Sequence, residues 1–436
     1  MAKFHIAEIT AAEVDDRFWE KYVLARQPVV IRGIYADEPL AEAATLDGAR
    51  RLLGQMPVLI QDEYTRQIDY TRKEFVESEE KPPEPKLGTL DEYLDGYGTQ
   101  EASRKVVTEW DLPTDVLRSF TIPEFCRPTT DHHSLYLHSF IAGPQNWAHL
   151  HFDMDQRHVL LAQIFGSKGV ALFPPSSSPW LHPFGNFGSI SLQVMEPEER
   201  RRFVELAGGA YTVIHPTDAV YIPPLLWHYL DYLDLGASFN VRFGRNPYSK
   251  FLSVENFLAD QYLQAVAEPF AGIAPGAEPS AGQRAVLEEV IGAFNKDYDS
   301  RHDKYRAMRQ VFRDLHKSQG LTPELPLFLF PLDEETDFYD EMRLNSNFLY
   351  RPGVRTSLEQ IATPEPPASP AQLQSLDKAV SAADYGPELL EKVLFNKFGK
   401  DSLAGLDREE ASRMLAFLRS PNGARPAAAP AARGDR

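Results

Sequence analysis

The sequence predicts a mainly β core of the jelly-roll type, with an α+β segment before it and a helical region after it. Between residues 130 and 247, short apolar runs alternate with turn residues, as at 166–169 and 216–218, which is typical of an antiparallel sandwich. After Lys250 the apolar residues recur every three or four positions, which indicates helices. The runs expected to form strands are Ser134–Ile141, Val159–Phe165, Val170–Phe173, Tyr211–Ile214, Ala219–Ile222 and Ser238–Phe243.

Residues 1–110 are expected to form the α+β lead-in. The spacing of Val14, Phe18 and Tyr22 predicts a helix over 11–26. The β-branched run at 28–33 ends at a glycine and predicts a short strand. Residues 81–86 are rich in proline and charge, so we expect an exposed loop there.

The core is expected to span residues 111–250, with one helical insertion at Glu196–Leu206. The last predicted strand has two different faces, because side chains alternate along a strand. Its apolar residues are Phe239, Val241 and Phe243, and its polar residues are Ser238, Asn240 and Arg242. An apolar outer face and a polar inner face suit a barrel whose interior holds a polar ligand.

Three segments follow the core. Residues 251–362 are predicted to be a helical extension, which offers an interface for a homodimer. A proline-rich linker at 363–370 leads to a small helical unit at 371–419. The tail at 422–436 is rich in Ala, Pro and Arg and is predicted to be disordered.

The composition is that of an acidic globular protein. Its 45 Lys+Arg and 63 Asp+Glu give a formal net charge of −18, which repels nucleic acids and is more compatible with a cationic peptide or a small substrate. The single cysteine excludes an intrachain disulfide and a thiolate zinc cluster, and it fits a reducing compartment. The sequence has neither a long apolar run nor a secretory signal. We therefore expect a cytoplasmic protein that binds neither nucleic acid nor membrane.

The motif that carries chemistry is His151-Phe152-Asp153, followed by His228. Residues i and i+2 of a strand point to the same face, so His151 and Asp153 present an imidazole and a carboxylate to one point. A histidine from a neighbouring strand completes the two-histidine, one-carboxylate set of non-haem iron(II) oxygenases, which leaves positions open for reactants. We therefore predict that His151, Asp153 and His228 bind a metal and are catalytic. His149 faces the same side if the strand is regular, and we interpret it as a hydrogen-bonded structural histidine.

Two cations are candidates to hold a carboxylate inside the barrel. Lys168 follows a tight turn, one strand beyond the H-x-D motif. Arg242 lies on the polar face of the last strand, and a guanidinium binds a carboxylate in a bidentate manner. Tyr136 and His138 share one face of their strand and are candidates to line the pocket.

Together these motifs resemble the JmjC/cupin-like family of iron(II)- and 2-oxoglutarate-dependent dioxygenases. The most similar branch is the one typified by the asparaginyl hydroxylase that acts on hypoxia-inducible factor. The resemblance covers roughly residues 20–250. It rests on the H-x-D motif, the G-x-K at 166–168, the L-F-P-P run at 172–175, Asp218 before a Tyr-Ile-Pro strand, Trp227-His228 and the entry strand at 29–33. It implies a double-stranded β-helix of the cupin type.

The resemblance also implies the cofactors and their contacts. It makes Fe(II) the metal, 2-oxoglutarate and O2 the co-substrates, and Lys168 the partner of the distal carboxylate of 2-oxoglutarate. The protein orders these reactants and excludes water, while the cofactor supplies the difficult chemistry. Arg242 is the alternative anchor for that carboxylate, and Tyr136 is a further candidate contact of the co-substrate.

Three features depart from the branch. Ala148 stands three residues before the first ligand, where a threonine is frequent, and Arg157 and His158 stand where an asparagine is usual. The stretch from Asp153 to Lys168 is also about two residues longer, so a bulged or shifted strand is expected. These departures concern the co-substrate contacts more than the metal ligands.

The leading functional hypothesis is hydroxylation of an amino-acid side chain in a peptide, a protein or a carrier-bound precursor. N-methyl-lysine or N-methyl-arginine demethylation is a second enzymatic hypothesis, and the lack of a recognisable reader domain favours hydroxylation over it. A non-catalytic cupin that binds a metal or a small molecule is a third. The substrate itself is not encoded in these motifs, because loops and terminal additions set specificity in such barrels.

Overall fold

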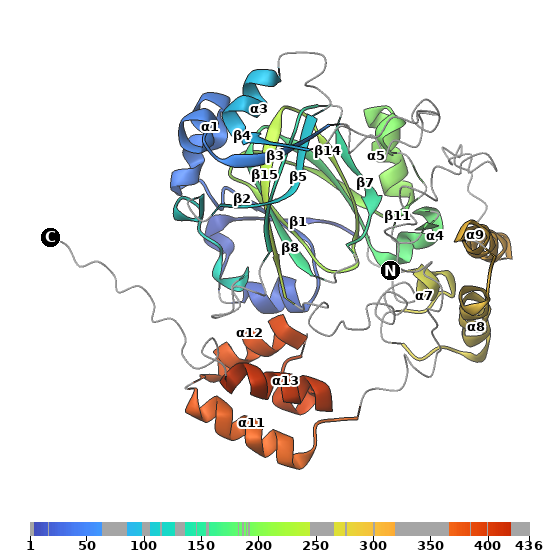
Figure 1. The fold of residues 1–436 in the computed structure, drawn as a ribbon. Coiled ribbons are helices and arrows are strands. Elements are labelled where there is room, and N and C mark those ends of the chain that lie inside the picture. The colour runs from blue at the N-terminus through green and yellow to red at the C-terminus, as the bar shows by residue number, and fades with distance from the viewer. Residues whose placement is uncertain are drawn as a thin grey trace.

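The computed structural model confirms the predicted fold class (Figure 1). It describes residues 4–15, 17–62, 85–97, 105–113, 116–126, 136–144, 146–153, 157–181, 183–184, 187–188, 190, 192–244, 266–274, 277–299, 301–318, 366–383, 385–398 and 400–419. No helix among these residues is both long enough and apolar enough to span a membrane.

Two mainly antiparallel sheets face each other. Within the described residues, the larger sheet has nine strands in the order β1-β2-β13-β8-β15-β6-β5-β3-β4, and only the pairing of β1 with β2 is parallel. Its strands are β1 (Ala7–Thr10), β2 (Val29–Arg32), β3 (Pro57–Asp62), β4 (Lys86–Thr89), β5 (Lys105–Asp111), β6 (Tyr136–Ala142), β8 (His158–Phe165), β13 (Ala219–Ile222) and β15 (Gly236–Phe243). The smaller sheet has the order β10-β11-β7-β14-β9-β12. Its strands are β7 (Trp147–His151), β9 (Lys168–Phe173), β10 (Pro183–Phe184), β11 (Phe187–Gly188), β12 (Ala210–Ile214) and β14 (Trp227–Tyr232).

An apolar cluster fills part of the space between the two sheets. The larger sheet contributes Val159 and Val220 to it, and the smaller sheet contributes Val170 and Leu172. All four side chains are at least 96% buried. This cluster holds the sheets together, and the remaining part of the interior is lined by polar side chains.

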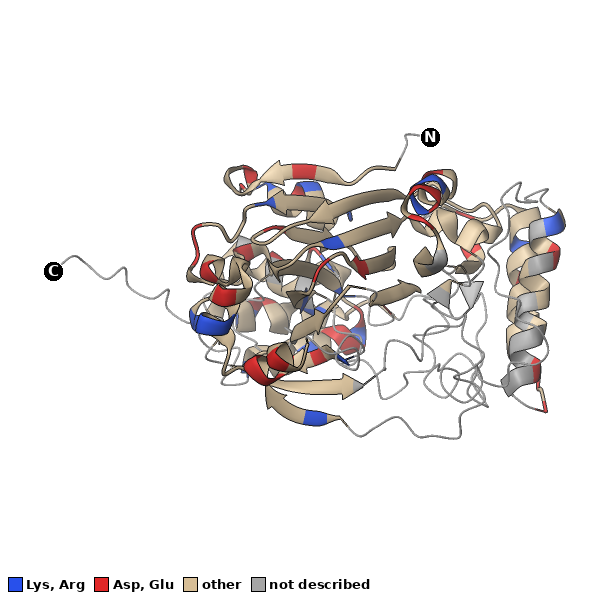
Figure 2. Cartoon of the chain, turned by 90° about the horizontal axis from the view of Figure 1, so that it is seen from above, with Lys and Arg blue, Asp and Glu red and all other residues tan. Residues whose placement is uncertain are grey.

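Each sheet is covered on its outer face by helices or loops. Phe239, Val241 and Phe243 of β15 pack against the N-terminal segment, as the alternation of that strand predicts. The outer face of the smaller sheet packs against α4 (Ser178–Leu181), α5 (Pro197–Leu206), α7 (Glu268–Phe270), α8 (Ala281–Asn295) and α9 (Arg301–Ser318). In Figure 2 the strands are mostly uncharged, and the acidic and basic residues gather in the helices and turns around them.

The N-terminal lead-in differs from its prediction in one element. In place of one continuous helix over 11–26 the chain forms a 3-10 turn at Ala11–Glu13 and a separate helix of the π type at Trp19–Leu24. Between them the Asp15 carboxylate accepts a hydrogen bond from the backbone amide of Arg17 (3.0 Å), and such local side-chain bonds compete with a continuous helix. The helical prediction therefore holds for Trp19–Leu24 but not for the whole stretch, whereas the strand predicted at 28–33 forms as β2.

Two further helices, α1 (Leu46–Leu53) and α3 (Leu90–Gly96), complete the lead-in. Of the loop predicted at 81–86, residues 81–84 lie outside the described residues and Lys86 is the first residue of β4. The predicted insertion helix at 196–206 forms as α5. Because β5 and β2 belong to the larger sheet, the lead-in contributes strands directly to the core.

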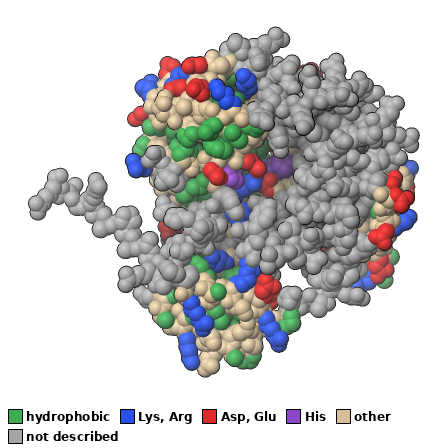
Figure 3. Space-filling model, in the orientation of Figure 1, with side chains coloured by type: hydrophobic (Ala, Val, Ile, Leu, Met, Phe, Trp, Pro, Cys, Tyr) green, Lys and Arg blue, Asp and Glu red, His purple; other side chains and the backbone are tan. Residues whose placement is uncertain are grey.

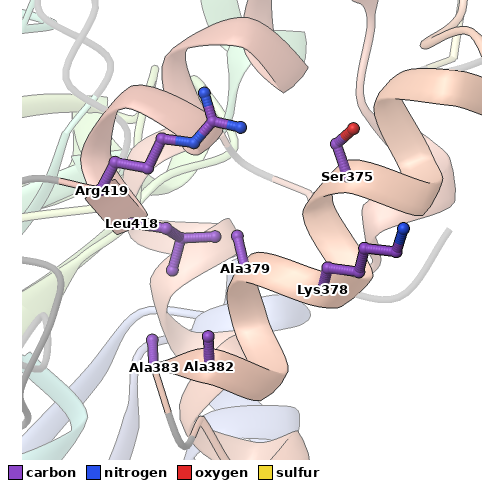
Figure 4. A pocket seen from close by; sticks show the side chains of 7 residues that line it. All are labelled: Ser375, Lys378, Ala379, Ala382, Ala383, Leu418 and Arg419. Carbon is purple, nitrogen blue, oxygen red and sulfur yellow. The ribbon is translucent and has the colours of Figure 1, made fainter.

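The small C-terminal unit has a hydrophobic cluster of its own. The unit consists of α11 (Pro370–Ala382), α12 (Pro387–Phe398) and α13 (Arg408–Arg419). A cavity of about 430 Å³ lies on this unit. Figure 4 shows the side chains that line it, among them Leu418 and alanines of α11 between Lys378 and Arg419. The helical spacing predicted at 251–265 and the tail at 422–436 lie outside the described residues.

An arginine on the entry strand joins three strands of the fold. Arg32 of β2 donates to the carboxylate of Asp218 (2.7 Å), to the carbonyl oxygen of Val213 (2.8 Å) and to Glu8 (2.7 Å). The Asp218 carboxylate also accepts from the backbone amides of Gly33 (3.0 Å) and His215 (3.1 Å). The two sequence motifs, the Arg-Gly that ends the entry strand and the aspartate before the Tyr-Ile-Pro strand, are therefore two halves of one contact.

We expect Asp218→Ala to lower the free energy of unfolding by about 3 kcal/mol, because it removes a 9% exposed carboxylate that accepts from a partly buried guanidinium and from two amides. Glu8 is 53% exposed, so Glu8→Ala should cost under about 1 kcal/mol. All five tryptophans lie between Trp19 and Trp227, so urea unfolding followed by tryptophan fluorescence reports on this core. Equal losses in the two variants would contradict the ranking by burial.

Candidate functional site

The three predicted metal ligands come together at the end of two neighbouring strands. His151 of β7 lies directly opposite His228 of β14, and Asp153 follows His151 by two residues. One nitrogen of each imidazole and one carboxylate oxygen all lie within 4.8 Å of one another. Figure 3 shows histidine, acidic and basic side chains side by side on this face of the molecule.

The residues next to the ligands fix the two strands from the other side. Phe152 and Trp227 are both almost completely buried, and their rings meet edge to face with centroids 4.8 Å apart. The indole nitrogen of Trp227 donates to the hydroxyl of Ser178 (2.8 Å). Because neighbouring side chains on a strand point in opposite directions, these aromatic contacts also orient His151 and His228 toward the interior.

A β-bulge in β7 separates His149 from the ligand face. His228 is opposite His151, but Leu230 is opposite Ala148, so β7 has one extra residue between these two pairs. Ala148 therefore faces the same side as His151, as in the family pattern with a residue three positions before the first ligand. His149 is buried, and its Nε2 lies 2.7 Å from the carbonyl oxygen of Gly188. The hydrogen bond expected of a structural histidine is therefore present. The strand is not regular here, so His149 does not face the same side as His151.

Backbone carbonyls determine which nitrogen of each ligand histidine is available. The Nδ1 atom of His151 is 2.5 Å from the carbonyl oxygen of His149, and that of His228 is 3.0 Å from the carbonyl oxygen of Leu226. A carbonyl only accepts, so Nδ1 carries the hydrogen in both rings. Each Nε2 atom then carries the lone pair that can bind a metal, in the arrangement typical of ligating histidines.

The electrostatics of the cluster favour a neutral His228 and an ionised Asp153. Burial, followed by the proximity of His151, lowers the pKa of His228 to about 4. Burial alone would raise the pKa of Asp153, but the guanidinium of Arg242 and the two histidines lower it overall, well below its usual value. Two imidazoles and one negative carboxylate oxygen are a donor set for a divalent transition metal.

Lys168 lies in the same interior, farther along the strands. Lys168 lies opposite Tyr232 of β14. Leu172, four residues after Lys168 on β9, lies opposite His228. Lys168 and His228 therefore face the same side of the sheet, roughly 13 Å apart along it. Its ammonium donates to the hydroxyl of Ser238 (2.6 Å) and lies 4.1 Å from the centre of the Tyr232 ring. The side chain is 2% exposed, and burial lowers its pKa to about 7.

Arg242 is placed at the opposite end, beside the metal ligands. Its guanidinium is 3.0 Å from Glu109 and 3.7 Å from Asp153. Tyr136 is opposite Arg242 on β6, but its side chain lies outside the described residues. His138, also on β6, has its Nε2 atom 3.4 Å from the carboxylate of Asp111. The structure thus separates the two candidate anchors, with Lys168 deep in the barrel and Arg242 near the ligands.

Sequence reasoning missed Glu109, which no local pattern identifies as a site residue. It lies on β5 with a positive φ of 51° and reaches Arg242 from a strand 133 residues earlier in the chain. Ser238, the partner of Lys168, is on the inward face that the alternation of β15 predicts. Both residues become recognisable only when the strand order is known.

Comparisons with known proteins show which family and which proteins this chain is similar to. The sequence model of the family described as "Cupin-like domain" matches residues 15–247. Lysine-specific demethylase 8 of Xenopus tropicalis is 22% identical over 245 residues, which are 52% of this chain and 50% of that protein. The protein of the same name from Danio rerio is 24% identical over 242 residues, 52% of this chain and 55% of that protein. Jumonji C domain-containing protein 5 of Drosophila melanogaster is 31% identical over 86 residues, 17% of this chain and 20% of that protein. The chain spans about half the length of the two demethylases.

We expect Lys168 to make the stability of the metal-free protein increase with pH. Its pKa falls from 10.5 in the unfolded chain to about 7 in the folded one, so between these values the unfolded state binds more protons. The free energy of unfolding then rises by up to about 1.4 kcal/mol per pH unit above pH 7, and is flat below it for this group.

Urea unfolding of wild type and Lys168→Met at pH 6, 7, 8 and 9 measures this effect. Lys168→Met should be the more stable protein at pH 6, with a difference that narrows as the pH rises. Lys317→Met removes an exposed lysine and should follow wild type throughout. A constant difference between wild type and Lys168→Met would show that Lys168 does not titrate in this range.

Proposed function

Because the chain belongs to the Cupin-like domain family, we propose that it is an iron(II)- and 2-oxoglutarate-dependent oxygenase that hydroxylates an amino-acid side chain. The observation that carries the proposal is the convergence of His151, Asp153 and His228 within 4.8 Å. The overall reaction combines a substrate C–H bond, 2-oxoglutarate and O2 to give the hydroxylated substrate, succinate and CO2.

The donor set fits the proposed metal. Two imidazole nitrogens and one carboxylate oxygen on one side of an ion are the ligands of non-haem iron(II) oxygenases, and they leave positions open for co-substrate and oxygen. His151 and His228 would bind through Nε2, and Asp153 through its carboxylate. When bound, Fe(II) would activate O2, which is the oxidant of the reaction. The barrel orients the reactants around it and keeps water out.

The placement of the two cations supports Lys168 as the anchor of 2-oxoglutarate. A dicarboxylate bound at the ligands with one end points its other end along the interior, and Lys168 is the cation on that side. Ser238 and Tyr232, which already contact its ammonium, supply a hydroxyl and an aromatic face beside the same position. Arg242, the alternative anchor, already has Glu109 and Asp153 within 4.0 Å.

The substrate we propose is a side chain in a peptide, a protein or a carrier-bound precursor. The net charge of −18 favours a cationic target. Demethylation is the second candidate, and the names of the two demethylases support it. It begins with the same hydroxylation, at a methyl group on nitrogen, and continues with loss of formaldehyde. A non-catalytic binding protein is the third candidate, and the intact donor set argues against it.

Two further expectations about the whole protein stay predictions. One is a homodimer formed through the 251–362 region, whose described helices α8 and α9 bury apolar residues against the smaller sheet. The other is a cytoplasmic location without a nucleic-acid or membrane partner.

The first test is succinate formation from 2-oxoglutarate in the presence of Fe(II) and O2, without added substrate. Wild type should form succinate slowly, and Asp153→Ala should reduce the rate by more than about 100-fold, because it removes a metal ligand rather than an outer contact. Asp234→Ala, which removes an exposed aspartate, is the matched control and should keep the wild-type rate. Equal rates in wild type and Asp153→Ala would contradict the oxygenase.

Formaldehyde released with methylated peptides would favour the demethylase instead.

The second test is the pH dependence of 2-oxoglutarate binding. A carboxylate beside Lys168 favours the ammonium, so binding above pH 7 should take up a proton and weaken as the pH rises. Calorimetry in two buffers of different ionisation enthalpy, at pH 6.5 and 8.5, measures that proton. Lys168→Met should weaken binding at least about tenfold, by loss of a charge-assisted contact, and abolish the uptake. Unchanged binding in Lys168→Met together with weakened binding in Arg242→Gln would transfer the role to Arg242.

A further inference from the structure

The strand that carries Glu109 has a bulge at that position. Val107 is opposite Ile141 and Trp110 is opposite Ser139, so β5 has three steps where β6 has two. A one-residue bulge reverses which side chains face the interior. It places Trp110 on the outer side, where its indole donates to the carbonyl oxygen of Pro57 (2.9 Å).

The bulge holds Glu109 in a backbone conformation that side chains rarely adopt. Its φ is 51°, in the left-handed region that favours glycine and, after it, asparagine. Glutamate has no intrinsic preference for this region of φ that would explain its presence there. Such positions persist where the surrounding structure requires them, and they gather at functional sites.

The contact that Glu109 makes is with Arg242, and through it with the metal ligands. The Glu109 carboxylate accepts from the Arg242 guanidinium at 3.0 Å, and the same nitrogen lies 3.7 Å from an oxygen of Asp153. Arg242 and Asp153 each have 16% of their side chains exposed, whereas Glu109 is 58% exposed. One cation thus stands between a rim carboxylate and a ligand carboxylate, and the shorter contact is to the rim.

This arrangement sets up a competition for the Asp153 carboxylate. A guanidinium and a divalent metal ion both bind a carboxylate oxygen. With Glu109 present, Arg242 is held toward the rim and Asp153 can bind a metal. Glu109 and Asp153 are the carboxylates within 4.0 Å of Arg242 among the described residues, so with the negative charge of Glu109 removed the guanidinium would pair with Asp153.

We propose that Glu109 is a positioning residue that keeps Arg242 from neutralising the metal ligand Asp153. The proposal rests on the proposed function, because it assumes that Asp153 binds a metal. It explains why a glutamate occupies a strained position in a bulge, and it makes Arg242 a residue whose effect on the metal depends on Glu109.

Metal affinity, measured by Mn(II) titration with electron paramagnetic resonance, tests the proposal without relying on activity. Glu109→Gln should weaken Mn(II) binding about tenfold, the size typical of contacts behind a metal ligand. Arg242→Gln should leave the affinity within about threefold of wild type, and the double variant should match Arg242→Gln. Asp111→Asn removes the 89% exposed carboxylate two residues along the same strand and should change the affinity by less than about twofold.

A second variant separates this role from a merely structural one. Glycine suits a positive φ, so the melting temperature of Glu109→Gly should be no lower than that of wild type. Its Mn(II) affinity should be weakened as much as that of Glu109→Gln. A purely structural residue would instead lower the melting temperature and leave affinity unchanged.

The outcomes distinguish this inference from the proposed function. Wild-type protein that binds no Mn(II) would remove the proposed function, and this inference with it. Normal wild-type binding with an unchanged Glu109→Gln would remove this inference alone. A double variant as weak as Glu109→Gln would also overturn it, because the loss would not pass through Arg242.

Discussion

The alternation of side chains along paired strands is the constraint on which the site depends. In β7 and β14, Phe152 and Trp227 pack into the outer core, and this packing turns His151 and His228 inward. A slip of one residue in either strand would send its ligand histidine into an apolar cluster. The aromatic pair outside the barrel therefore specifies the register on which the position of the candidate metal ligands depends.

The interior that this register creates is partly polar and largely buried, so the charges within it need partners. Arg242 stands between Glu109 and Asp153, while the contacts of the Lys168 ammonium in the described residues are the Ser238 hydroxyl and two aromatic rings. Burial consequently lowers the pKa of Lys168. Arg242 and Lys168 thus differ: Arg242 is matched by this protein's own acids, and Lys168 suits an acid brought in by a ligand.

Sequence alone predicted the fold class, and it singled out three residues that the structure brings within 4.8 Å of one another as candidate metal ligands. The i, i+2 rule joins His151 to Asp153, and the alternation of β15 puts Ser238 and Arg242 inside. It did not predict β7 and β14 as apolar runs, since their inward residues include ligands and other polar groups. The helix expected at 11–26 forms only in part, at Trp19–Leu24, because a short-range hydrogen bond at Asp15 interrupts the stretch. Glu109 could not be found, because its contact with Arg242 depends on strand order and on a bulge.

The ion pair between Arg32 and Asp218 has a consequence for the order in which the chain folds. Its two halves are 186 residues apart, and β2 gains its antiparallel neighbour β13 only when the chain has been made that far. Contacts of such long range slow folding, because the ends of a large loop must meet before the contact stabilises anything. On the ribosome, the entry strand β2 therefore keeps one unpaired edge until most of the barrel has been synthesised. During this interval the nascent chain depends most on chaperones.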